Sequence, residues 1–440
     1  MAIKKLTGDL KQKLIQQSLH RKLKNAAAGA DKPIASLNQA TVPDKFCRFD
    51  QHPGYIQMQI MTKGAEQLGI ASPFFRVHEG LAGATTVIDG RELINFASYN
   101  YLGLSGHPDI NQAATAAIEQ YGTSVSASRI VSGERPVHQQ LEQALAKVYD
   151  VDDAVVFVSG HATNVSTLGY LFGASDLIIH DEYIHNSSIV GARLSGAKRL
   201  PFAHNDLNAL ESLLRENRHR FERVIIVVEG LYSMDGDFPE LNRLVQLKQQ
   251  YRVFLMVDEA HSFGVLGKTG KGLREAFGVA GKDVDIWMGT LSKTLSGCGG
   301  YIAGESALIE NLRHLAPGFL YSVGIPAPVA AASVKSLEIM SQEPERVTRL
   351  QSISEYFISK ARELNLNTGE SAGIAIVPII LGSSVKAATL SSELFKQGIN
   401  VQPILYPAVP EKSARLRFFL CCEHTPEQID TTLNTLARLL

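Results

Sequence analysis

The stretch Val253-Phe254-Leu255-Met256-Val257-Asp258-Glu259-Ala260-His261-Ser262 decides the fold, because an uninterrupted apolar run ends abruptly in polar residues. A short run that is apolar at every position predicts a strand buried on both faces, as in a parallel sheet covered by helices. Such a strand delivers Asp258 to its carboxyl end, where open α/β sheets bind their ligands. An aspartate at a strand end also commonly caps the next turn. The role of Asp258 therefore depends on what else reaches the same edge.

Similar apolar runs recur along the chain and are separated by segments with helical periodicity. The runs are Ala154–Val158, Leu177–His180, Val224–Val228, Asp285–Met288 and Gly299–Ala303, and the clearest helical segments are Leu207–Glu216 and Leu241–Gln250. Strands that alternate with helices predict an α/β domain with a mainly parallel sheet. After Pro326–Pro328 the rhythm changes. Strands expected at Ala375–Ile380, Ile399–Ile404 and Leu416–Leu420 indicate a smaller α+β domain.

The N-terminal part has its own composition. The first 25 residues hold seven lysines and arginines against one acid, Asp9, and their apolar residues recur every three or four positions, which predicts a basic amphipathic helix. The helix either packs against its own globular body or docks on an acidic partner or an anionic surface. We divide the chain into a basic helix and linker (1–50), a segment packing on the body (51–93), a large domain (94–325) and a small C-terminal domain (326–440).

The overall composition is that of a globular protein without a charge imbalance. The 440 residues are 45% hydrophobic and 20% charged, and the formal net charge of −1 argues against wholesale nucleic-acid binding. No run approaches the roughly 18 apolar residues that a membrane span needs, and no apolar stretch follows Lys4 and Lys5 as in a secretory signal. The four cysteines form no CxxC pair, which is typical of a reducing compartment. We therefore expect a cytoplasmic protein.

Three common kinds of site find little support. Residues 262–269 come within one residue of a phosphate-binding P-loop, but Ser262 stands where the first glycine belongs. No GxGxxG opens a helix after the first strand, and no HExxH or Cys/His cluster has zinc spacing. We therefore expect neither a nucleotide nor a metal site.

The residues at the strand ends instead suit pyridoxal phosphate (PLP). This cofactor needs a lysine for its aldehyde, an acid for its pyridine nitrogen, an anion cradle for its phosphate and a flat group against its ring. Lys293 follows the strand expected at Asp285–Met288, in a loop of hydroxyl residues and glycines where burial would lower its pKa. Lysines in surface loops are common, so Lys293 alone decides nothing.

The other three parts also have candidates. Asp258 would pair with the pyridine nitrogen, and His261, three residues later, could reach the phenolic oxygen. A strand turns into a helix at Ser159-Gly160-His161, and backbone N–H groups at a helix N-terminus bind phosphate. His185 lies just past the strand Leu177–His180 and would stack on the ring, although a lone histidine there is more often structural.

The order and spacing of these pieces resemble the α-oxoamine synthases. The motifs are Ser159-Gly-x-x-x-Asn164, His185-x-Ser187, Glu229-Gly-Leu-Tyr-Ser-Met-Asp-Gly-Asp237, Asp258-Glu-Ala-His261-Ser262 and Gly289-Thr-Leu-Ser-Lys293, and the likeness runs from about residue 94 to residue 440. Ser98–Gly103 and Cys422–Gln428 look most like serine palmitoyltransferases and polyketide-associated members. The resemblance implies PLP-dependent transferase fold type I, an α/β fold with a mainly parallel seven-stranded sheet in the large domain and a small α+β domain.

The resemblance also implies residue roles. Lys293 would carry PLP and move the substrate's α-proton, while Asp258 holds the ring nitrogen and His185 stacks on the ring. Cofactor contacts are implied for Ser159, Gly160, His161, Thr290 and Ser292 at the phosphate, for His261 and Ser233 at the phenolic oxygen, and for Ser322, which would reach the phosphate of the other protomer in a homodimer. Arg417 would bind the amino-acid carboxylate with its planar fork, with Tyr99 and Asn100 beside the substrate.

Three positions depart from the family pattern. His161 stands where Phe or Tyr is usual, which puts the phosphate-loop contacts in question. Val323-Gly324 replaces the hydroxyl and small residue often found after Ser322, which weakens the assignment of Ser322 to the other protomer. Leu405 replaces an arginine of the oxononanoate synthases, whose acyl chain ends in a carboxylate, so it argues against pimeloyl-type substrates.

The implied reaction is a decarboxylative Claisen condensation. A small amino acid (glycine, alanine or serine) would react with an acyl thioester, carried by CoA or by an acyl carrier protein, to give an α-aminoketone. Serine palmitoyltransferase proper, and another fold-type I reaction such as aldol cleavage or transamination, stay open as alternatives. A non-catalytic partner subunit would lose the lysine, so the presence of Lys293 argues against it.

Overall fold

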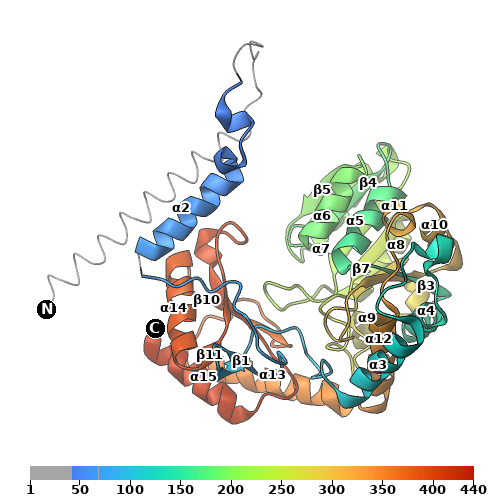
Figure 1. The fold of residues 1–440 in the computed structure, drawn as a ribbon. Helices are drawn as coiled ribbons and strands as arrows, with labels where there is room; N and C mark the ends of the chain where they lie inside the picture. Colours follow the sequence, from blue (N-terminus) through green and yellow to red (C-terminus); the bar gives the residue numbers. More distant parts are fainter. Residues whose placement is uncertain (1–41, 68) are drawn as a thin grey trace, which may run out of the picture.

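The computed structural model describes residues 42–67 and 69–440. The basic helix predicted over the first 25 residues lies outside this range. Figure 1 shows a large domain built on one sheet, a smaller one that contains the C-terminus, and α2 (Pro53–Gln67) extending from the side of the smaller one. Among the described residues, no helix combines the length and the apolar character needed to cross a membrane.

The large domain contains a seven-stranded sheet in the order β3-β9-β8-β7-β6-β4-β5. Its strands are β3 (Asp153–Phe157), β4 (Leu177–Asp181), β5 (Lys198–Phe202), β6 (Val224–Glu229), β7 (Phe254–Asp258), β8 (Ile286–Thr290) and β9 (Gly300–Gly304). Only β9 runs against its neighbours, so the predicted mainly parallel sheet is confirmed. The runs named from the sequence did not include β5, because this edge strand has lysine, arginine and proline in place of an apolar run.

Helices cover both faces of this sheet. Along β6, Val224, Ile226 and Val228 pack into one core with α4, α7 and α8, whereas Ile225 and Val227 pack into another with α5, α6 and α10. All five side chains are at most 1% exposed, and burying each stabilises the fold by about 1.5–3 kcal/mol. The helices of this domain are α3 (Pro108–Tyr121), α4 (Pro136–Tyr149), α5 (Gly160–Leu171), α6 (Asn186–Leu194), α7 (Leu207–Asn217), α8 (Leu241–Tyr251), α9 (Leu273–Phe277), α10 (Ser306–Leu315) and α11 (Pro317–Leu320).

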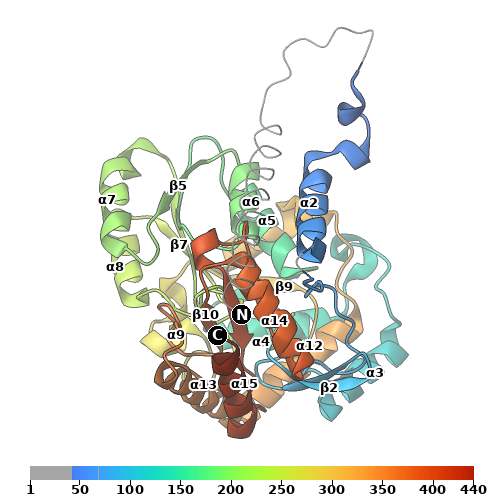
Figure 2. The ribbon, with the colours of Figure 1, turned by 90° about the vertical axis from the view of Figure 1, so that its left-hand side faces the viewer.

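Two three-stranded sheets form the smaller part of the molecule (Figure 2). One has the order β10-β13-β12, with β10 (Ile376–Ile380), β12 (Gln402–Ile404) and β13 (Arg415–Phe419), and the other joins β1 (Thr85–Ile88) and β2 (Arg91–Asn95) to β11 (Ile399–Asn400). Helices α13 (Glu345–Glu363), α14 (Ser384–Lys396) and α15 (Pro426–Leu439) complete it. The pairing of β2 with β11 attaches residues 85–95 to the C-terminal part of the chain.

Helix α12 (Ala327–Gln342) links the two parts and packs against α3 and α4 of the large domain. Short helical turns complete the described chain: η1 (Asp44–Phe46), η2 (Phe49–Gln51), the π-turn η3 (Arg129–Gly133), η4 (Arg218–Arg220), η5 (Gly281–Asp283) and η6 (Glu411–Ser413). The carboxyl ends of β4, β6, β7 and β8 lie at one edge of the large sheet, where parallel strands gather their polar residues.

Candidate active site

Two buried carboxyl groups lie side by side at this edge. Glu229 ends β6 and Asp258 ends β7, and the two residues are register partners. Each is 4% exposed. Burial and the neighbouring Asp258 raise the pKa of Glu229 to about 8, so its carboxyl is largely protonated at neutral pH. Within the described part of the chain Glu229 Oε1 has no hydrogen-bond partner. The site therefore holds a largely neutral carboxyl group, that of Glu229, directly beside Asp258.

A chain of hydrogen bonds links Asp258 to His185. Asn164 Nδ2 donates to Asp258 Oδ2 at 2.8 Å and to Ser187 Oγ at 3.0 Å. Ser187 Oγ in turn lies 2.7 Å from His185 Nδ1. Burial lowers the pKa of His185, which favours its neutral ring. The structure thus brings the predicted ring-stacking residue and the predicted acid into one polar network.

His261 is held by two aromatic residues, Tyr101 and Phe419. Its Nδ1 lies 2.7 Å from the hydroxyl of Tyr101, and its ring is parallel to that of Phe419 at 6.2 Å. Burial, with smaller effects from nearby cations, lowers the pKa of His261 well below its ordinary value. The neutral ring is therefore anchored through Nδ1, and Nε2 is its remaining polar atom.

Lys293 lies in the loop after β8. Burial lowers the pKa of its amine to about 8, although the nearby Asp258 and Glu229 act in the opposite direction. Its Nζ lies 5.5 Å from the centre of the Tyr99 ring. A lysine with this pKa has a substantial neutral fraction near pH 7–8, and the neutral amine is the nucleophilic and basic form.

The two halves of the predicted anion cradle meet. Helix α5 begins at Gly160, where a Cβ would lie 3.1 Å from Thr290 Oγ1, so the helix start and the end of β8 are in contact. Ser159 caps the helix by accepting from Ala162 N at 3.0 Å, and Thr290 Oγ1 donates to Gly299 O at 2.9 Å. His161 is exposed on the first turn, and Ser292 is exposed two residues beyond Thr290. The helix N-terminus and these hydroxyls form a surface suited to an anion.

Arg417 enters the site from β13 of the small domain. Its Nη1 donates to Ser233 O at 2.9 Å, and its guanidinium lies 4.6 Å from the centre of the Phe419 ring. The residue is 9% exposed, and its Nε has no hydrogen-bond partner within the described residues. A buried guanidinium with an unused donor is suited to bind a carboxylate.

Three other predicted residues, Tyr99, Asn100 and Ser322, do not bond to the polar network around Asp258 among the described residues. Tyr99 is 40% exposed and meets His261 edge to face, with ring centres 5.8 Å apart. Asn100 is buried, and its side-chain oxygen accepts from Ser105 N at 3.0 Å, within its own turn. Ser322 Oγ donates to Gly318 O at 2.7 Å. Among the described residues, no hydrogen bond joins Ser322 to the other predicted site residues of this protomer.

The sequence prediction missed Asn164, Glu229 and Tyr101 as members of the site. Asn164 lies one helical turn after Gly160, on the buried face of α5, and this spacing is a signal that could have been used. Glu229 occupies the same strand-end place as Asp258. Tyr101 is 160 residues from His261, and its contact depends on how the N-terminal part of the chain folds back.

The chain is similar to a known protein family over most of its length. The profile described as aminotransferase class I and II matches residues 91–436. The chain belongs to this family. A relative named 8-amino-7-oxononanoate synthase, from Symbiobacterium thermophilum, is 42% identical over 376 residues, which are 86% of this chain and 95% of the relative.

Solved structures agree with this result. A serine palmitoyltransferase solved with PLP has a TM-score of 0.83 and 29% identity, over 88% of this chain and 97% of that one. An 8-amino-7-oxononanoate synthase from Francisella tularensis has a TM-score of 0.70 and 29% identity, over 79% and 97%. The chain is therefore a PLP-dependent α-oxoamine synthase-type enzyme with the aminotransferase class I and II fold.

The residues present fit PLP. The cofactor requires a reactive lysine, a buried acid and an anion cradle, and the structure has Lys293, Asp258 and the Gly160–Thr290 contact at one sheet edge. Glycine at position 300 keeps the cradle open, because a Cβ there would lie 2.6 Å from Gly160 Cα. The unpartnered polar atoms Asn164 Oδ1, Glu229 Oε1 and Arg417 Nε belong to the same site.

Proposed function

We propose that the enzyme condenses a small L-amino acid (glycine, alanine or serine) with an acyl thioester, with loss of CO₂, to give an α-aminoketone. The observation that carries this proposal is the half-buried Lys293, whose pKa is lowered to about 8, in a site that also contains the unpaired donor of Arg417. The similarity to a relative named 8-amino-7-oxononanoate synthase and to structures of serine palmitoyltransferase supports the same class of chemistry.

Each residue has a definite task in this proposal. When bound, PLP supplies an electron sink for the bonds at the substrate's Cα. Lys293 would hold the cofactor, and its neutral amine would take the α-proton from the substrate and return it. Asp258, bonded to Asn164, would pair with the pyridine nitrogen and favour its protonated form. His185 would stack on the cofactor ring, and Arg417 would hold the substrate carboxylate that leaves as CO₂.

The phosphate end and the phenolic end are fixed by separate groups. The N-terminus of α5 at Gly160 and His161, with Ser159, Thr290 and Ser292, would hold the phosphate through backbone N–H groups and hydroxyls. His261 and Ser233 would approach the phenolic oxygen. The anchoring of His261 by Tyr101 supports this role, because it commits Nδ1 and keeps Nε2 for a donor contact.

Release of free thiol tests the proposed reaction. The purified holoenzyme is given each amino acid with an acyl thioester, and thiol and CO₂ are measured. We expect both products, and only when amino acid and thioester are present together. Formation of a keto acid without thiol would indicate transamination, and release of an aldehyde without thioester would indicate aldol cleavage. Either result would replace the proposed reaction.

We also propose that the acyl chain ends without a charge. The product of the 8-amino-7-oxononanoate synthases is a carboxylate at its far end, as its name states. Leu405, half-buried after β12, is an apolar residue where an arginine would be expected for such a chain. Heptanoyl and pimeloyl thioesters have the same length, so we expect the heptanoyl donor to give the higher kcat/KM. A preference for pimeloyl would refute this proposal.

We further propose a homodimer, in the cytoplasm, in which Ser322 completes the phosphate site of the other protomer. Large apolar side chains surround Ser322 on the surface: Tyr321 is 86% exposed, Val131 is 77% exposed, and Ile130 and Val323 are also exposed. Apolar surface gathered in this way is typical of a subunit interface. All four cysteines are free, in keeping with a reducing compartment.

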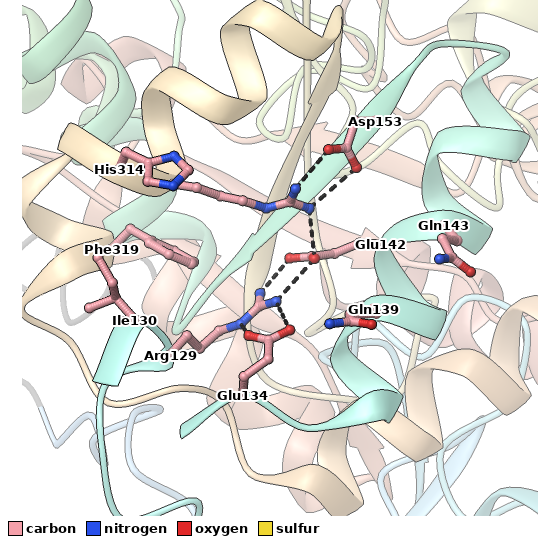
Figure 3. A pocket seen from close by; sticks show the side chains of 10 residues that line it. Arg129, Ile130, Glu134, Gln139, Glu142, Gln143, Asp153, His314 and Phe319 are labelled. Atoms are coloured by element: carbon pink, nitrogen blue, oxygen red, sulfur yellow. Dashed lines mark hydrogen bonds and ion pairs between the residues drawn. The ribbon is translucent and has the colours of Figure 1, made fainter. Parts of the chain in front are cut away.

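A partly buried ionic network lies beside Ile130 and Phe319 (Figure 3). Arg129 pairs with Glu134 and Glu142, and Arg313 pairs with Glu142 and Asp153. These residues line a pocket of about 440 Å³ beside Ile130, away from Lys293. Because its charges are mutually paired, we interpret the network as a rigid support for residues 129–134 and not as a second site.

A further inference from the structure

A histidine outside the cofactor contacts bridges a buried and a partly buried carboxylate. His204 lies between β5 and α7, with Nδ1 2.9 Å from Asp181 Oδ1 and Nε2 2.8 Å from Asp237 Oδ2. The exposed side-chain fractions are 16% for His204, 0% for Asp181 and 13% for Asp237. Tyr183 stacks on the imidazole at 4.4 Å, and Tyr232 meets it edge to face at 4.5 Å. Both ring nitrogens of His204 are therefore committed to acids.

The first of these acids holds the turn that leads to His185. Asp181 ends β4, and its carboxylate accepts from Tyr183 N and from Asn205 N, each at 2.8 Å, in addition to His204. His185 follows four residues later and begins the polar chain to Asp258. The path of the backbone into His185 is thus set by the carboxylate that His204 binds.

The second acid closes the turn that contains Ser233. Tyr232 N donates to Asp237 O at 2.8 Å across this turn, and Asn205 Nδ2 donates to the Asp237 carboxylate at 2.7 Å. The turn is pressed against the small domain, because a Cβ at Gly236, whose φ is +71°, would lie 2.0 Å from Ile376 O. Residues 231–237 therefore have little freedom to move as long as Asp237 is held.

The same turn positions the arginines of β13. Ser233 O accepts from Arg417 Nη1 at 2.9 Å, and Met234 O accepts from Arg415 Nη1 at 2.9 Å. Arg415 also pairs with Asp235 at 2.6 Å. A displacement of the turn would therefore move Arg417, the candidate carboxylate-binding residue, relative to His185.

Serving two carboxylates at once requires N–H donors on both ring nitrogens, which only the imidazolium has. Burial lowers the pKa of His204, but the hydrogen bonds to Asp181 and Asp237 more than reverse this effect and raise it to about 10. The other titratable groups facing the ring are Tyr183, Tyr232 and Glu182. The carboxylate of Glu182 accepts a hydrogen bond from the backbone N–H of His204. The Arg415–Asp235 ion pair lies farther from the ring.

We propose that His204 is a positioning residue that acts as an ionised clamp. By binding Asp181 and Asp237 together, it fixes the loop of His185 against the loop that holds Arg417, and so sets the distance between the ring-stacking group and the carboxylate-binding group. The proposal rests on the proposed roles of His185 and Arg417 in amino-acid binding. A salt bridge that served stability alone would leave amino-acid affinity unchanged, and this difference can be measured.

The test uses His204→Gln in the PLP-loaded full-length protein, with His219→Gln, exposed on η4, as the matched control. Amino-acid affinity is read from the change in PLP absorbance on adding glycine, alanine or serine alone. We expect His204→Gln to retain PLP and to bind the amino acid about tenfold more weakly, since small misplacements of binding groups are costly. Asp237→Asn keeps the side-chain shape and serves if His204→Gln does not fold.

A second measurement, the pH dependence of Tm, tests whether His204 is charged. The folded-state pKa of His204 lies above the ordinary value of about 6.5. The charged imidazole therefore contributes its full stabilisation of the folded protein below about pH 6.5, and this contribution is lost as the pH rises toward 10. The gap in Tm between wild type and His204→Gln should narrow over this range. A constant gap, or wild-type amino-acid affinity in the folded variant, would overturn the proposal. Because no acyl donor is used, failure of the condensation reaction would not be confused with failure of the clamp.

Discussion

The polar frame around Asp258 and the surface around Ser322 differ in how far a single chain completes them. In the frame, Asp258, Asn164 and His185 belong to one continuous network of hydrogen bonds, in which Asp258 and Asn164 are buried and His185 is exposed. Around Ser322, the side chain of Tyr321 is almost fully exposed, and the Ser322 hydroxyl bonds only locally, to Gly318 O. The first region is complete within one protomer, and we propose that a second copy of the chain completes the other.

This difference separates the chemistry of the site from its assembly. Groups that must keep a defined charge and orientation during catalysis are satisfied by neighbours from the same sheet edge, which preorganises them. The apolar surface around Ser322 instead has the character of an interface between identical subunits. Variants in the frame should therefore damage catalysis directly, and variants at the surface should act through oligomeric state and cofactor retention.

The largest effect is expected for Lys293→Ala. Without this amine the protein has no covalent attachment for PLP and no base for the α-proton, so turnover should fall below detection. The measurement is the absorbance of the bound cofactor, borohydride trapping and mass mapping of the labelled peptide. Lys268→Ala, an exposed lysine of the loop that resembles a P-loop, is the control and should keep full activity. A PLP label on another lysine would disprove the assignment.

Asp258→Asn should impair catalysis while the protein still binds PLP. The neutral amide no longer favours a protonated pyridine nitrogen, and we expect a loss of about 2–4 kcal/mol at the transition state, with PLP still bound. Turnover is measured against Asp89→Asn, an exposed residue of the β1–β2 turn. Activity within threefold of wild type would show that Asp258 does not face the cofactor nitrogen.

Much of the polar frame could be predicted from the sequence. Buried parallel strands are recognisable as apolar runs, and the polar residues of the site follow directly after these runs. Asp258 and Lys293 were predicted in this way. Tyr101 and His204 were not, since each acts through a partner distant in sequence, as Tyr101 does with His261, 160 residues away. Periodicity carries no information about such contacts, and only the folded chain shows them.

Tyr321→Asp should test the unfinished region. A charge placed in an apolar subunit interface is costly to bury, so we expect dissociation toward monomers in sedimentation and roughly tenfold weaker PLP retention. Leu194→Asp, an exposed apolar position on α6, is the control and should stay assembled. A fully active monomeric Tyr321→Asp protein would show that the site needs nothing from a second copy.

The lowered pKa of Lys293 predicts a pH dependence for cofactor uptake by the PLP-free protein. The neutral amine attacks the aldehyde, and its fraction rises through a pKa of about 8. The rate of PLP incorporation should therefore rise about tenfold between pH 7 and pH 9 and then level off. Stopped-flow absorbance measures this rate. A rate still rising tenfold per unit above pH 9 would mean that the amine keeps an ordinary lysine pKa.

The smallest and most selective effect is expected at the N-terminus, whose predicted helix carries seven basic residues on an otherwise nearly neutral chain. Acyl carrier proteins are acidic around their prosthetic arm, so charge complementarity would raise the rate of encounter and would be screened by salt. Deleting residues 1–25 should raise KM for an acyl-carrier donor severalfold and leave activity with a small thioester mimic nearly unchanged. Equal losses with both donors would mean that the segment supports the fold, because a structural defect does not depend on the carrier. Wild-type kinetics with both donors would exclude the basic residues from donor recognition.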